Sequence, residues 1–380
     1  MIDRDIGVRI GIPPRNYHNE KRFGFNIDGI EWKIIKRVPF YNGITTRVLP
    51  SRYSKILNAV SLYYDKSGID GIHTFNSIVL NDSSPWIVSS ERYVPTWVKP
   101  HRTKWIADWL FSRLGSENCR AILSSSENAK KNLIDMYSYH PSINEVSKKT
   151  KVVYPAIRKS ALPNKRNKNK FEKKLKILFV DAGDFLKKGG DLVIDAFSHL
   201  ESEYFNLTMV TEFECWSGGR FTFEERSPRN TDVKYLRRKA QSMDVEVKDT
   251  MPYDEVRKLM GENDILVFPS LEETFGFVVP EAMAEGTVPI TLGIRAMPEI
   301  INDGESGFLI DVPTERDGSL DRESVSPEKI IKSIVSVLRY ARENPKTVKK
   351  MARQATKEFE KKFSRDVISE DLKSVYENCF

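Results

Sequence analysis

Short apolar runs recur along the chain and alternate with segments of polar and helical spacing. Most of these runs span four or five residues rich in Ile, Val and Leu, which is typical of strands buried on both faces. We expect strands at Val8 to Ile12, Ile69 to His73, Trp86 to Ser89, Ile177 to Val180 and Asp264 to Phe268. Strands that alternate with helices form parallel sheets, so the pattern predicts an α/β protein.

A basic segment with few apolar residues divides this pattern. Residues 158–176 contain nine Lys or Arg and one Glu, a composition typical of a linker. With a total length of 380 residues, the chain is expected to form two domains. We place an N-terminal domain at 1–157, the linker at 158–174 and a C-terminal domain at 175–360.

Two carboxylates follow the expected strand that ends at Phe268. Residues 269–286 read PSLEETFGFVVPEAMAEG, with Glu273 before an expected helix and Glu281 on it. The glycine of Phe275-Gly276-Phe277 favours a turn, and the first turn of a helix offers N–H groups and a positive dipole end to an anion. The glutamates could then accept hydrogen bonds from two hydroxyl-bearing parts of one ligand. Alternatively, both are solvated surface residues, as most glutamates are.

A second block precedes this one. Residues 175–197 read LKILFVDAGDFLKKGGDLVIDAF, a strand, a loop and a helix, and the loop carries Gly183, Lys187, Lys188, Gly189 and Gly190. Glycine lets a backbone approach a phosphate closely, and a lysine supplies a point charge there. The alternative is an ordinary turn with solvated lysines, but two such blocks in this order favour a phosphate site.

Both blocks resemble retaining glycosyltransferases of the two-Rossmann-domain (GT-B) type, most closely family 4. Residues 269–286 are similar to the E-x7-E segment of that family, and Val288-Pro289-Ile290 and residues 298–309 are similar to the elements that follow it. Arg120 to Leu123 and Lys151 to Pro155 resemble late strands of the family's N-terminal domain. The resemblance implies a GT-B fold, two Rossmann-like domains whose parallel sheets face each other across a cleft. It also implies that residues 361–380 form a C-terminal helix that crosses back to the N-terminal domain.

The resemblance further implies a chemistry and a set of roles. Lys188 is expected to stabilise the leaving diphosphate, Glu273 to hold the transferred sugar and Glu281 to hold the ribose. The remaining donor contacts are expected from Phe275, Gly276, Phe277, Gly183 and Lys187. The donor would be a UDP- or GDP-linked sugar, and no cofactor or metal ion is expected. The reaction would be hexosyl transfer, with retained anomeric configuration, to a saccharide or lipid-linked acceptor.

The chain departs from the family pattern at three places, one of which is the loop after the first N-terminal strand, where the usual glycine-rich sequence is not evident. Many members have an arginine shortly before the lysine, whereas residues 181–184 read DAGD. Either Lys187 takes over part of its charge, or the diphosphate is bound more weakly, or a basic residue arrives from elsewhere, for which Arg295 is a candidate. Where many relatives have a histidine after an N-terminal strand, this chain has Glu91, which either orients the acceptor or the sugar or is an exposed residue at a strand end. His73 is likewise either a cleft residue or a hydrogen-bonded histidine at a strand end.

Tryptophan and basic residues occur together in residues 93–114, which contain Trp97, Trp105 and Trp109. This composition is typical of a helix at a membrane surface, and the alternative is a helix packed on the N-terminal sheet. The basic residues of 158–176 either contact anionic lipid or an acidic acceptor, or are solvated.

Composition excludes several classes of protein. No run of 18 apolar residues exists that could span a membrane, and the N-terminus lacks the basic-then-apolar order of a signal peptide. The three cysteines are far apart and the five histidines show no metal-ligand spacing, so neither a disulfide framework nor a metal site is predicted. We expect a cytoplasmic protein with peripheral contact to a membrane face.

Two other functions stay open from the sequence. A GT-B nucleotide-sugar epimerase would use the same donor site without an acceptor. A nucleic-acid-binding protein is suggested by a pI of about 9.0 and by the basic linker. The second is the weaker alternative, and nucleic acid is not the partner that we expect.

Overall fold

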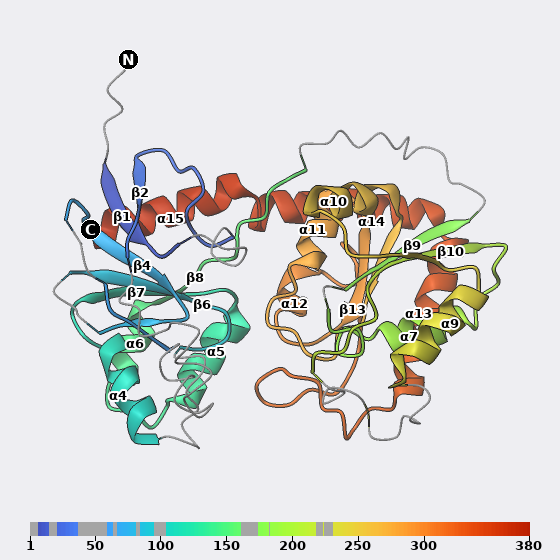
Figure 1. Cartoon of the computed structure of the whole chain (residues 1–380), viewed down its shortest axis with the longest axis horizontal. Coiled ribbons are helices and arrows are strands. Elements are labelled where there is room, and N and C mark those ends of the chain that lie inside the picture. The colour runs from blue at the N-terminus through green and yellow to red at the C-terminus, as the bar shows by residue number, and fades with distance from the viewer. Residues whose placement is uncertain are drawn as a thin grey trace, which may run out of the picture. The chain divides into compact units, whose positions relative to one another are not determined.

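The computed structural model describes residues 7–14, 21–36, 59–63, 67–80, 84–94, 104–160, 174–181, 183–217, 223 and 231–380. The chain divides into two compact units, Met1–Ala156 with Arg365–Phe380, and Ile157–Ser364. Each unit is built around one parallel sheet with helices against it (Figure 1).

The N-terminal unit contains a six-stranded sheet in the order β2-β1-β4-β6-β7-β8. All neighbouring strands pair in parallel. The strands are β1 (Val8–Ile12), β2 (Ile30–Ile34), β4 (Gly71–Phe75), β6 (Trp86–Ser90), β7 (Cys119–Ser124) and β8 (Thr150–Val152). A separate parallel pair is formed by β3 (Val60–Ser61) and β5 (Ile78–Val79).

Helices cover both faces of this sheet. One core cluster includes Val88 of β6 and residues of α4 (Lys104–Leu114), α5 (Glu127–Met136) and α6 (Ile143–Lys149). The other includes Ile87 and residues of α15 (Arg365–Cys379). Adjacent residues of a strand point to opposite faces, so an uninterrupted apolar run such as that of β6 fills both cores. Because α15 contributes residues to the second cluster, the C-terminal helix is part of the core of the N-terminal unit.

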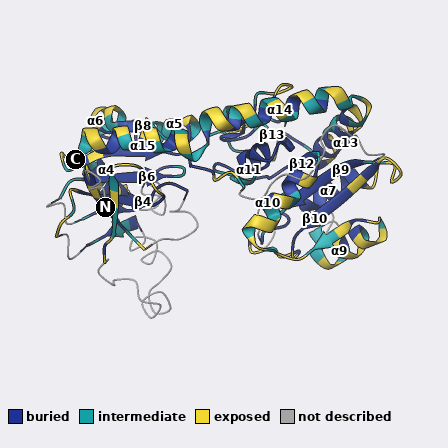
Figure 2. Cartoon of the chain, turned by 90° about the horizontal axis from the view of Figure 1, so that it is seen from above, coloured by how far each residue is buried: buried dark blue, intermediate teal, exposed yellow. Residues whose placement is uncertain are grey.

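The C-terminal unit contains a six-stranded sheet in the order β11-β10-β9-β12-β13-β14. Its strands are β9 (Leu175–Val180), β10 (Phe205–Val210), β11 (Glu246–Lys248), β12 (Ile265–Phe268), β13 (Val288–Leu292) and β14 (Phe308–Ile310), all parallel to their neighbours. Numbered along the chain, this order is 3-2-1-4-5-6, that of a doubly wound nucleotide-binding sheet. Figure 2 shows the central strands buried and the outer sides of α9 and α10 exposed.

Helices connect these strands and follow the last one. They are α7 (Gly190–Phe197), α9 (Val233–Ser242), α10 (Tyr253–Glu262), α11 (Val278–Ala284), α12 (Met297–Ile300), α13 (Pro327–Glu343) and α14 (Pro345–Lys362). The side chain of Ser326 caps α13 by accepting a hydrogen bond from the backbone N–H of Lys329, and Pro327 occupies the first turn, where its missing N–H costs little.

Both units are parallel α/β structures, as the apolar pattern predicted, and several boundaries differ. Strand β4 begins at Gly71, two residues after the expected start, because pairing with β1 starts there. Strand β8 ends at Val152, and the N–H of Ala156 bonds to the carbonyl of Lys21 instead of continuing the ladder. The C-terminal unit extends to Ser364, since α14 continues to Lys362.

Candidate functional site

The predicted donor residues follow two neighbouring strands of the C-terminal sheet. Strand β9 pairs with β10 on one side and with β12 on the other, so the strand order reverses between β9 and β12. Ligands of open α/β sheets bind at such a reversal, outside the carboxyl ends of the strands. Lys188 follows β9 and Glu273 follows β12, so the fold brings both to this edge.

The loops that carry these residues are joined by hydrogen bonds. The N–H of Leu271 donates to the carbonyl oxygen of Lys187 at 2.9 Å, and the Ser270 hydroxyl approaches the same oxygen at 3.3 Å. Gly189 has a φ of +73°, and a Cβ there would lie 2.4 Å from the carbonyl oxygen of Pro269. Gly189 therefore makes room for the second loop, a local reason that the sequence did not reveal.

Lys188 and Glu273 form an ion pair between Nζ and Oε1. Their side chains are only 21% and 13% exposed, and Nζ lies 5.3 Å from the centroid of the Phe268 ring. An ammonium group has three N–H donors, so Lys188 can hold Glu273 and still donate to a further oxygen. The two residues predicted to be catalytic, 85 positions apart, are thus in direct contact.

Asp181 shapes the loop after β9, and no sequence motif pointed to it. Its carboxylate accepts hydrogen bonds from the N–H groups of Gly183 and Asp184 at 3.0 and 2.9 Å, and from the Thr211 hydroxyl at 3.1 Å. Burial raises its pKa above the ordinary value despite these bonds. The ring of Trp216, which is 72% exposed, lies against Gly183, where a Cβ would come within 2.3 Å of it. Gly183 accordingly accommodates an aromatic ring from the loop after β10.

Glu281 lies on α11, as the sequence predicted, and is almost completely buried. Its Oε1 accepts a hydrogen bond from the Tyr253 hydroxyl at 3.0 Å. Phe275 is also buried, with its ring centroid 5.6 Å from that of Phe277 and 5.9 Å from that of Phe363. A side chain so placed packs the loop, which leaves the backbone as the part of Phe275 suited to a ligand.

Gly276 has a φ of +73°, the left-handed conformation that favours glycine. A Cβ at this position would come within 2.3 Å of the Met297 methyl carbon. The turn before α11 therefore needs glycine both for its backbone and for the close approach of α12.

Arg295 is held by two carboxylates. Its Nη2 lies 3.2 Å from Glu272 Oε1, and its Nη1 lies 2.9 Å from Asp317 Oδ2 and donates to the Asp317 carbonyl oxygen at 2.8 Å. Burial alone would raise the pKa of Asp317, but hydrogen bonds from Ser319 and the charge of Arg295 hold it well below its usual range. Arg295 thus contacts the residue next to Glu273 in the chain, with its guanidinium already engaged by protein oxygens.

His73 is fully buried within β4. Its Nδ1 is 2.7 Å from the Tyr376 hydroxyl and its Nε2 is 2.8 Å from the Ser89 hydroxyl. Burial lowers its pKa to about 3. This environment is that of a hydrogen-bonded histidine, because both ring nitrogens contact protein hydroxyls.

Glu91 lies just after β6 and is partly exposed. Its Oε1 accepts a hydrogen bond from Arg22 Nη2 at 2.8 Å, and the Arg22 guanidinium stacks 4.1 Å from the Phe75 ring centroid. Its own N–H donates to Asn76 Oδ1 at 3.2 Å. The structure therefore places Glu91 at the carboxyl edge of the N-terminal sheet, in an ion pair with Arg22.

The predicted tryptophan-rich segment includes α4, while residues 95–103, with Trp97, lie outside the described residues. The buried face of α4 is made by Ala107, Leu110, Phe111 and Leu114. Trp105 and Trp109 lie on the other face and are 77% and 50% exposed. The helix thus packs on the sheet and also presents two tryptophans to solvent. Most of the basic segment 158–176, residues 161–173, is likewise outside the described residues.

Neither a metal cluster nor a membrane-spanning helix occurs among the described residues. In this part of the chain, His, Cys, Asp and Glu side chains form no group of three or more that could hold a metal ion. Among the described helices, none is long and apolar enough to cross a membrane.

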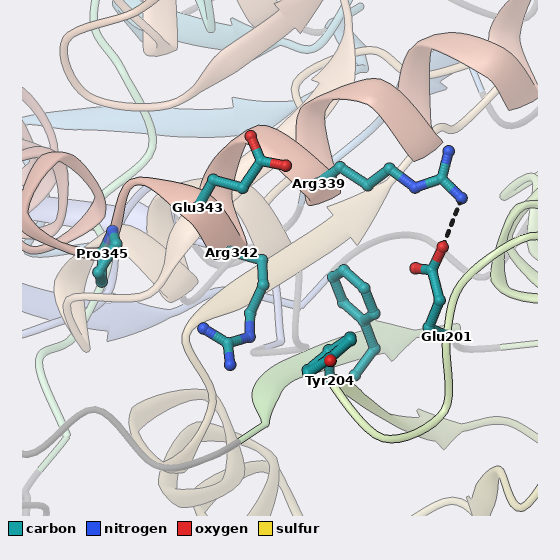
Figure 3. Close-up of a pocket in the computed structure, with 7 residues that line it drawn as sticks. Glu201, Tyr204, Arg339, Arg342, Glu343 and Pro345 are labelled. Atoms are coloured by element: carbon teal, nitrogen blue, oxygen red, sulfur yellow. Dashed lines mark hydrogen bonds and ion pairs between the residues drawn. The ribbon is translucent and has the colours of Figure 1, made fainter.

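A pocket of about 530 Å³ lies elsewhere in the C-terminal unit (Figure 3), lined by Glu201, Tyr204, Phe205, Arg339, Arg342, Glu343 and Pro345. Phe205 begins β10, so the pocket lies at the amino ends of the strands, opposite the edge that carries Lys188. Arg339 donates to Glu201 at 2.9 Å, and the Arg342 guanidinium is 5.4 Å from the Tyr204 ring centroid. Its lining charges balance, two arginines against two glutamates, and indicate no particular ligand.

The chain is similar in sequence to known glycosyltransferases. Residues 162–322 match the model of the family described as glycosyl transferases group 1. An uncharacterized glycosyltransferase of Methanocaldococcus jannaschii is 27% identical over 229 residues, 60% of this chain and 53% of that protein. A D-inositol 3-phosphate glycosyltransferase of Corynebacterium diphtheriae is 35% identical over 63 residues, 17% of this chain and 15% of that protein. The match to the first of these relatives thus spans about half of its length.

Solved structures establish the fold. The Anabaena protein HepE, in complex with UDP and glucose, matches with a TM-score of 0.57 at 15% identity, over 91% of this chain and 86% of that one. A glycosyltransferase from Rickettsia africae matches with a TM-score of 0.59 at 15% identity, over 97% and 89% of the two chains. The chain therefore has the GT-B fold of two Rossmann-like domains.

Proposed function

We propose that this protein is a metal-independent glycosyltransferase that moves a hexosyl group from a UDP- or GDP-linked sugar to a saccharide or lipid-linked acceptor, with retention of anomeric configuration. The observation that carries the proposal is the contact between Lys188 and Glu273 at the reversal of strand order. The match of residues 162–322 to glycosyl transferases group 1 covers both residues. HepE, which shares the fold, was solved with UDP-glucose.

Lys188 would stabilise the leaving group. As the bond between the anomeric carbon and the diphosphate breaks, negative charge builds on the diphosphate oxygens. A cation held in a fixed position near that charge lowers the barrier, because no reorganisation is needed at the moment of reaction. The ion pair with Glu273 and the hydrogen bonds of the Lys187 carbonyl fix the position of Lys188 before any donor binds.

The two glutamates would hold different parts of the donor. Glu273, next to the ammonium group, would accept hydrogen bonds from hydroxyls of the transferred sugar, while Glu281 on α11 would accept them from the ribose. A hydrogen bond to a charged group contributes about 1.5–3 kcal/mol. Loss of the ribose contact should weaken binding, whereas loss of the sugar contact should slow the reaction.

A panel of nucleoside diphosphates and their sugars in a thermal-shift assay tests the donor site, because a ligand that binds only the folded state raises its stability. We expect Glu281→Ala to reduce the shift, and Glu273→Gln to lower turnover more than binding. Glu305→Ala, at an exposed glutamate of the same unit, is the control. Wild-type turnover and affinity in both site variants would refute the assignment, and a modified nucleotide sugar formed without acceptor would instead identify an epimerase.

We further propose that the acceptor is lipid-linked and that α4 contacts the membrane surface. Trp105 and Trp109 are one turn apart on its exposed face, and Tyr139, which is 50% exposed, lies beside Lys104 with its ring centroid 4.1 Å from Nζ. Exposed aromatic rings with lysine and arginine nearby are suited to the interface between headgroups and acyl chains. The basic segment 158–176 would add an electrostatic attraction to anionic lipid.

Sedimentation with liposomes tests this contact. Wild-type protein should bind liposomes that contain anionic lipid at low salt, and added salt should weaken only the electrostatic part. Trp105→Ala/Trp109→Ala should bind less, whereas Tyr340→Ala, at an exposed aromatic residue of the C-terminal unit, should bind like wild type. Absence of binding to anionic liposomes at low salt would refute the membrane contact and leave the donor site untouched.

A further inference from the structure

Behind Glu281 lies a chain of buried polar contacts that connects α10 and α11. The Tyr253 hydroxyl donates to Glu281 Oε1 at 3.0 Å, and Arg257 Nη1 donates to the Tyr253 oxygen at 2.8 Å. Arg257 Nη2 forms an ion pair with Glu285. Tyr253 and Arg257 are four residues apart on α10, and Glu281 and Glu285 are four apart along α11 and its cap, so each pair shares one helix face. The two faces meet through these contacts.

The direction of the hydrogen bonds follows from chemistry. Arginine has donors but no acceptor, so the Tyr253 oxygen must accept from Arg257 and its single proton must go to Glu281. Burial, and then the charge of Glu281, raise the pKa of the Tyr253 hydroxyl, so it stays protonated at physiological pH. Tyr253 is therefore a hydrogen-bond donor to Glu281 Oε1, and this bond fixes the orientation of the carboxylate.

Arg257 is itself held in place from three sides. Arg257 is only 1% exposed. Besides its contacts with Tyr253 and Glu285, it donates to the carbonyl oxygen of Arg158 at 2.7 Å. Glu285 in turn accepts from the N–H of Ser160 at 3.2 Å. A guanidinium that reaches three groups is held more rigidly than a lysine in its place would be.

We propose that Tyr253, held by Arg257, is a positioning residue that orients Glu281 toward the donor nucleotide. The inference rests on the proposed function, because it takes Glu281 as the group that accepts from the nucleotide's ribose. Packing alone would be served by a phenylalanine at position 253. The hydroxyl instead donates to one carboxylate oxygen of Glu281 and so fixes how the carboxylate is turned.

The test is a double-mutant cycle on nucleotide affinity, with UDP and GDP as probes in calorimetry. Tyr253→Phe should weaken binding of the nucleotide that the wild type prefers by about tenfold, the size of one charge-assisted hydrogen bond. In the Glu281→Ala background the same change should have no further effect, because the group that it positions is gone. Tyr340→Phe, which removes a hydroxyl at an exposed tyrosine of the same unit, should bind like wild type.

A second variant separates positioning from folding. Arg257→Lys keeps a cation beside Glu285 but cannot also reach Tyr253 and the Arg158 carbonyl, so it should weaken nucleotide binding. The thermal midpoint of Tyr253→Phe, measured without nucleotide, should stay near that of wild type. If Tyr253→Phe lowers nucleotide affinity equally in both backgrounds, or does not lower it at all, the positioning role of Tyr253 is wrong and the proposed donor site is unaffected. A wild type that binds neither UDP nor GDP would overturn the proposed donor site, and this inference with it.

Discussion

Substitution of Gly189 by alanine tests how closely the two loops of the site approach each other. Gly189 precedes α7 with a φ of +73°, and Gly304, which has the same φ of +73°, provides a matched control. An alanine Cβ at position 189 would lie 2.4 Å from the carbonyl oxygen and 2.9 Å from Cγ of Pro269, whereas at position 304 nothing lies within 4 Å. Both glycines belong to the C-terminal unit. Because they share the same φ and differ in the space around the Cβ, the pair separates backbone strain from steric overlap.

The expected magnitudes differ by the cost of that overlap. A residue with a Cβ in the left-handed region loses roughly 1–2 kcal/mol, and this part applies to both variants. At position 189 the Pro269 carbonyl, part of the backbone after β12, must also move away, and such overpacking costs roughly 1–3 kcal/mol more. We therefore expect Gly189→Ala to lower the free energy of unfolding by about 2–5 kcal/mol and Gly304→Ala by about 1–2 kcal/mol.

Urea unfolding followed by circular dichroism measures the difference, with the slope against urea checked for constancy among the proteins. A second measurement is the thermal shift with nucleoside diphosphate, which should shrink in Gly189→Ala because the displaced backbone after β12 leads to Glu273, the ion-pair partner of Lys188. Equal losses of stability in the two variants would refute the close approach of Gly189 to Pro269. An undiminished nucleotide shift in Gly189→Ala would show that the loop's position does not matter for binding.

Two further predictions concern single charged or titratable side chains. Burial lowers the pKa of His73 to about 3 from 6.5, so its contribution to stability is fully present above pH 6.5 and is lost as the pH falls toward 3. The free energy of unfolding of the wild type should therefore fall by up to about 2 kcal/mol between pH 7 and pH 5, at about 1.36 kcal/mol per pH unit below 6.5. Urea unfolding should show that His73→Gln lacks this fall. The exposed control His199→Gln should behave like wild type. Lys188→Ala should lower turnover at least tenfold, or about 1.4 kcal/mol, whereas Lys187→Ala should cost less, because it is the backbone carbonyl of Lys187 that joins the loops. Equal and small losses from both lysine variants would place the diphosphate elsewhere.

Local patterns predicted the elements around the donor site well because these elements are encoded locally. Strands β9 and β12 contain the apolar runs 177–180 and 265–268, and each is followed by residues that favour a turn. Strand β13 was expected only from the resemblance of Val288-Pro289-Ile290 to the family. Strand β11 was missed, since Glu246–Lys248 is a three-residue edge strand with charged residues at both ends. Such a segment lacks the periodicity on which a strand prediction depends.

The side-chain contacts of the site could not be predicted in the same way. Lys188 meets Glu273 only because β9 and β12 are neighbours, and strand order is not written in any local pattern. Tyr253 was missed for the same reason, since its partner Glu281 is 28 residues away on another helix. For α4, by contrast, the exposure of Trp105 and Trp109 was accessible from the sequence, because Ala107, Leu110, Phe111 and Leu114 already define a different face by helical spacing.

The acidic residues of the motif 269–286 cannot be distinguished in the sequence, because their partners come from distant parts of the chain. Four glutamates lie between residues 272 and 285, namely Glu272, Glu273, Glu281 and Glu285. Glu272 and Glu285 face the guanidinium groups of Arg295 and Arg257, which are permanently charged and deeply buried. Removing one partner of such a pair leaves an uncompensated buried charge, so these two glutamates stabilise the fold around the site. Glu273 instead contacts the ammonium group of Lys188, and Glu281 accepts from the hydroxyl of Tyr253. These are the two carboxylates that we propose for the hydroxyls of the donor.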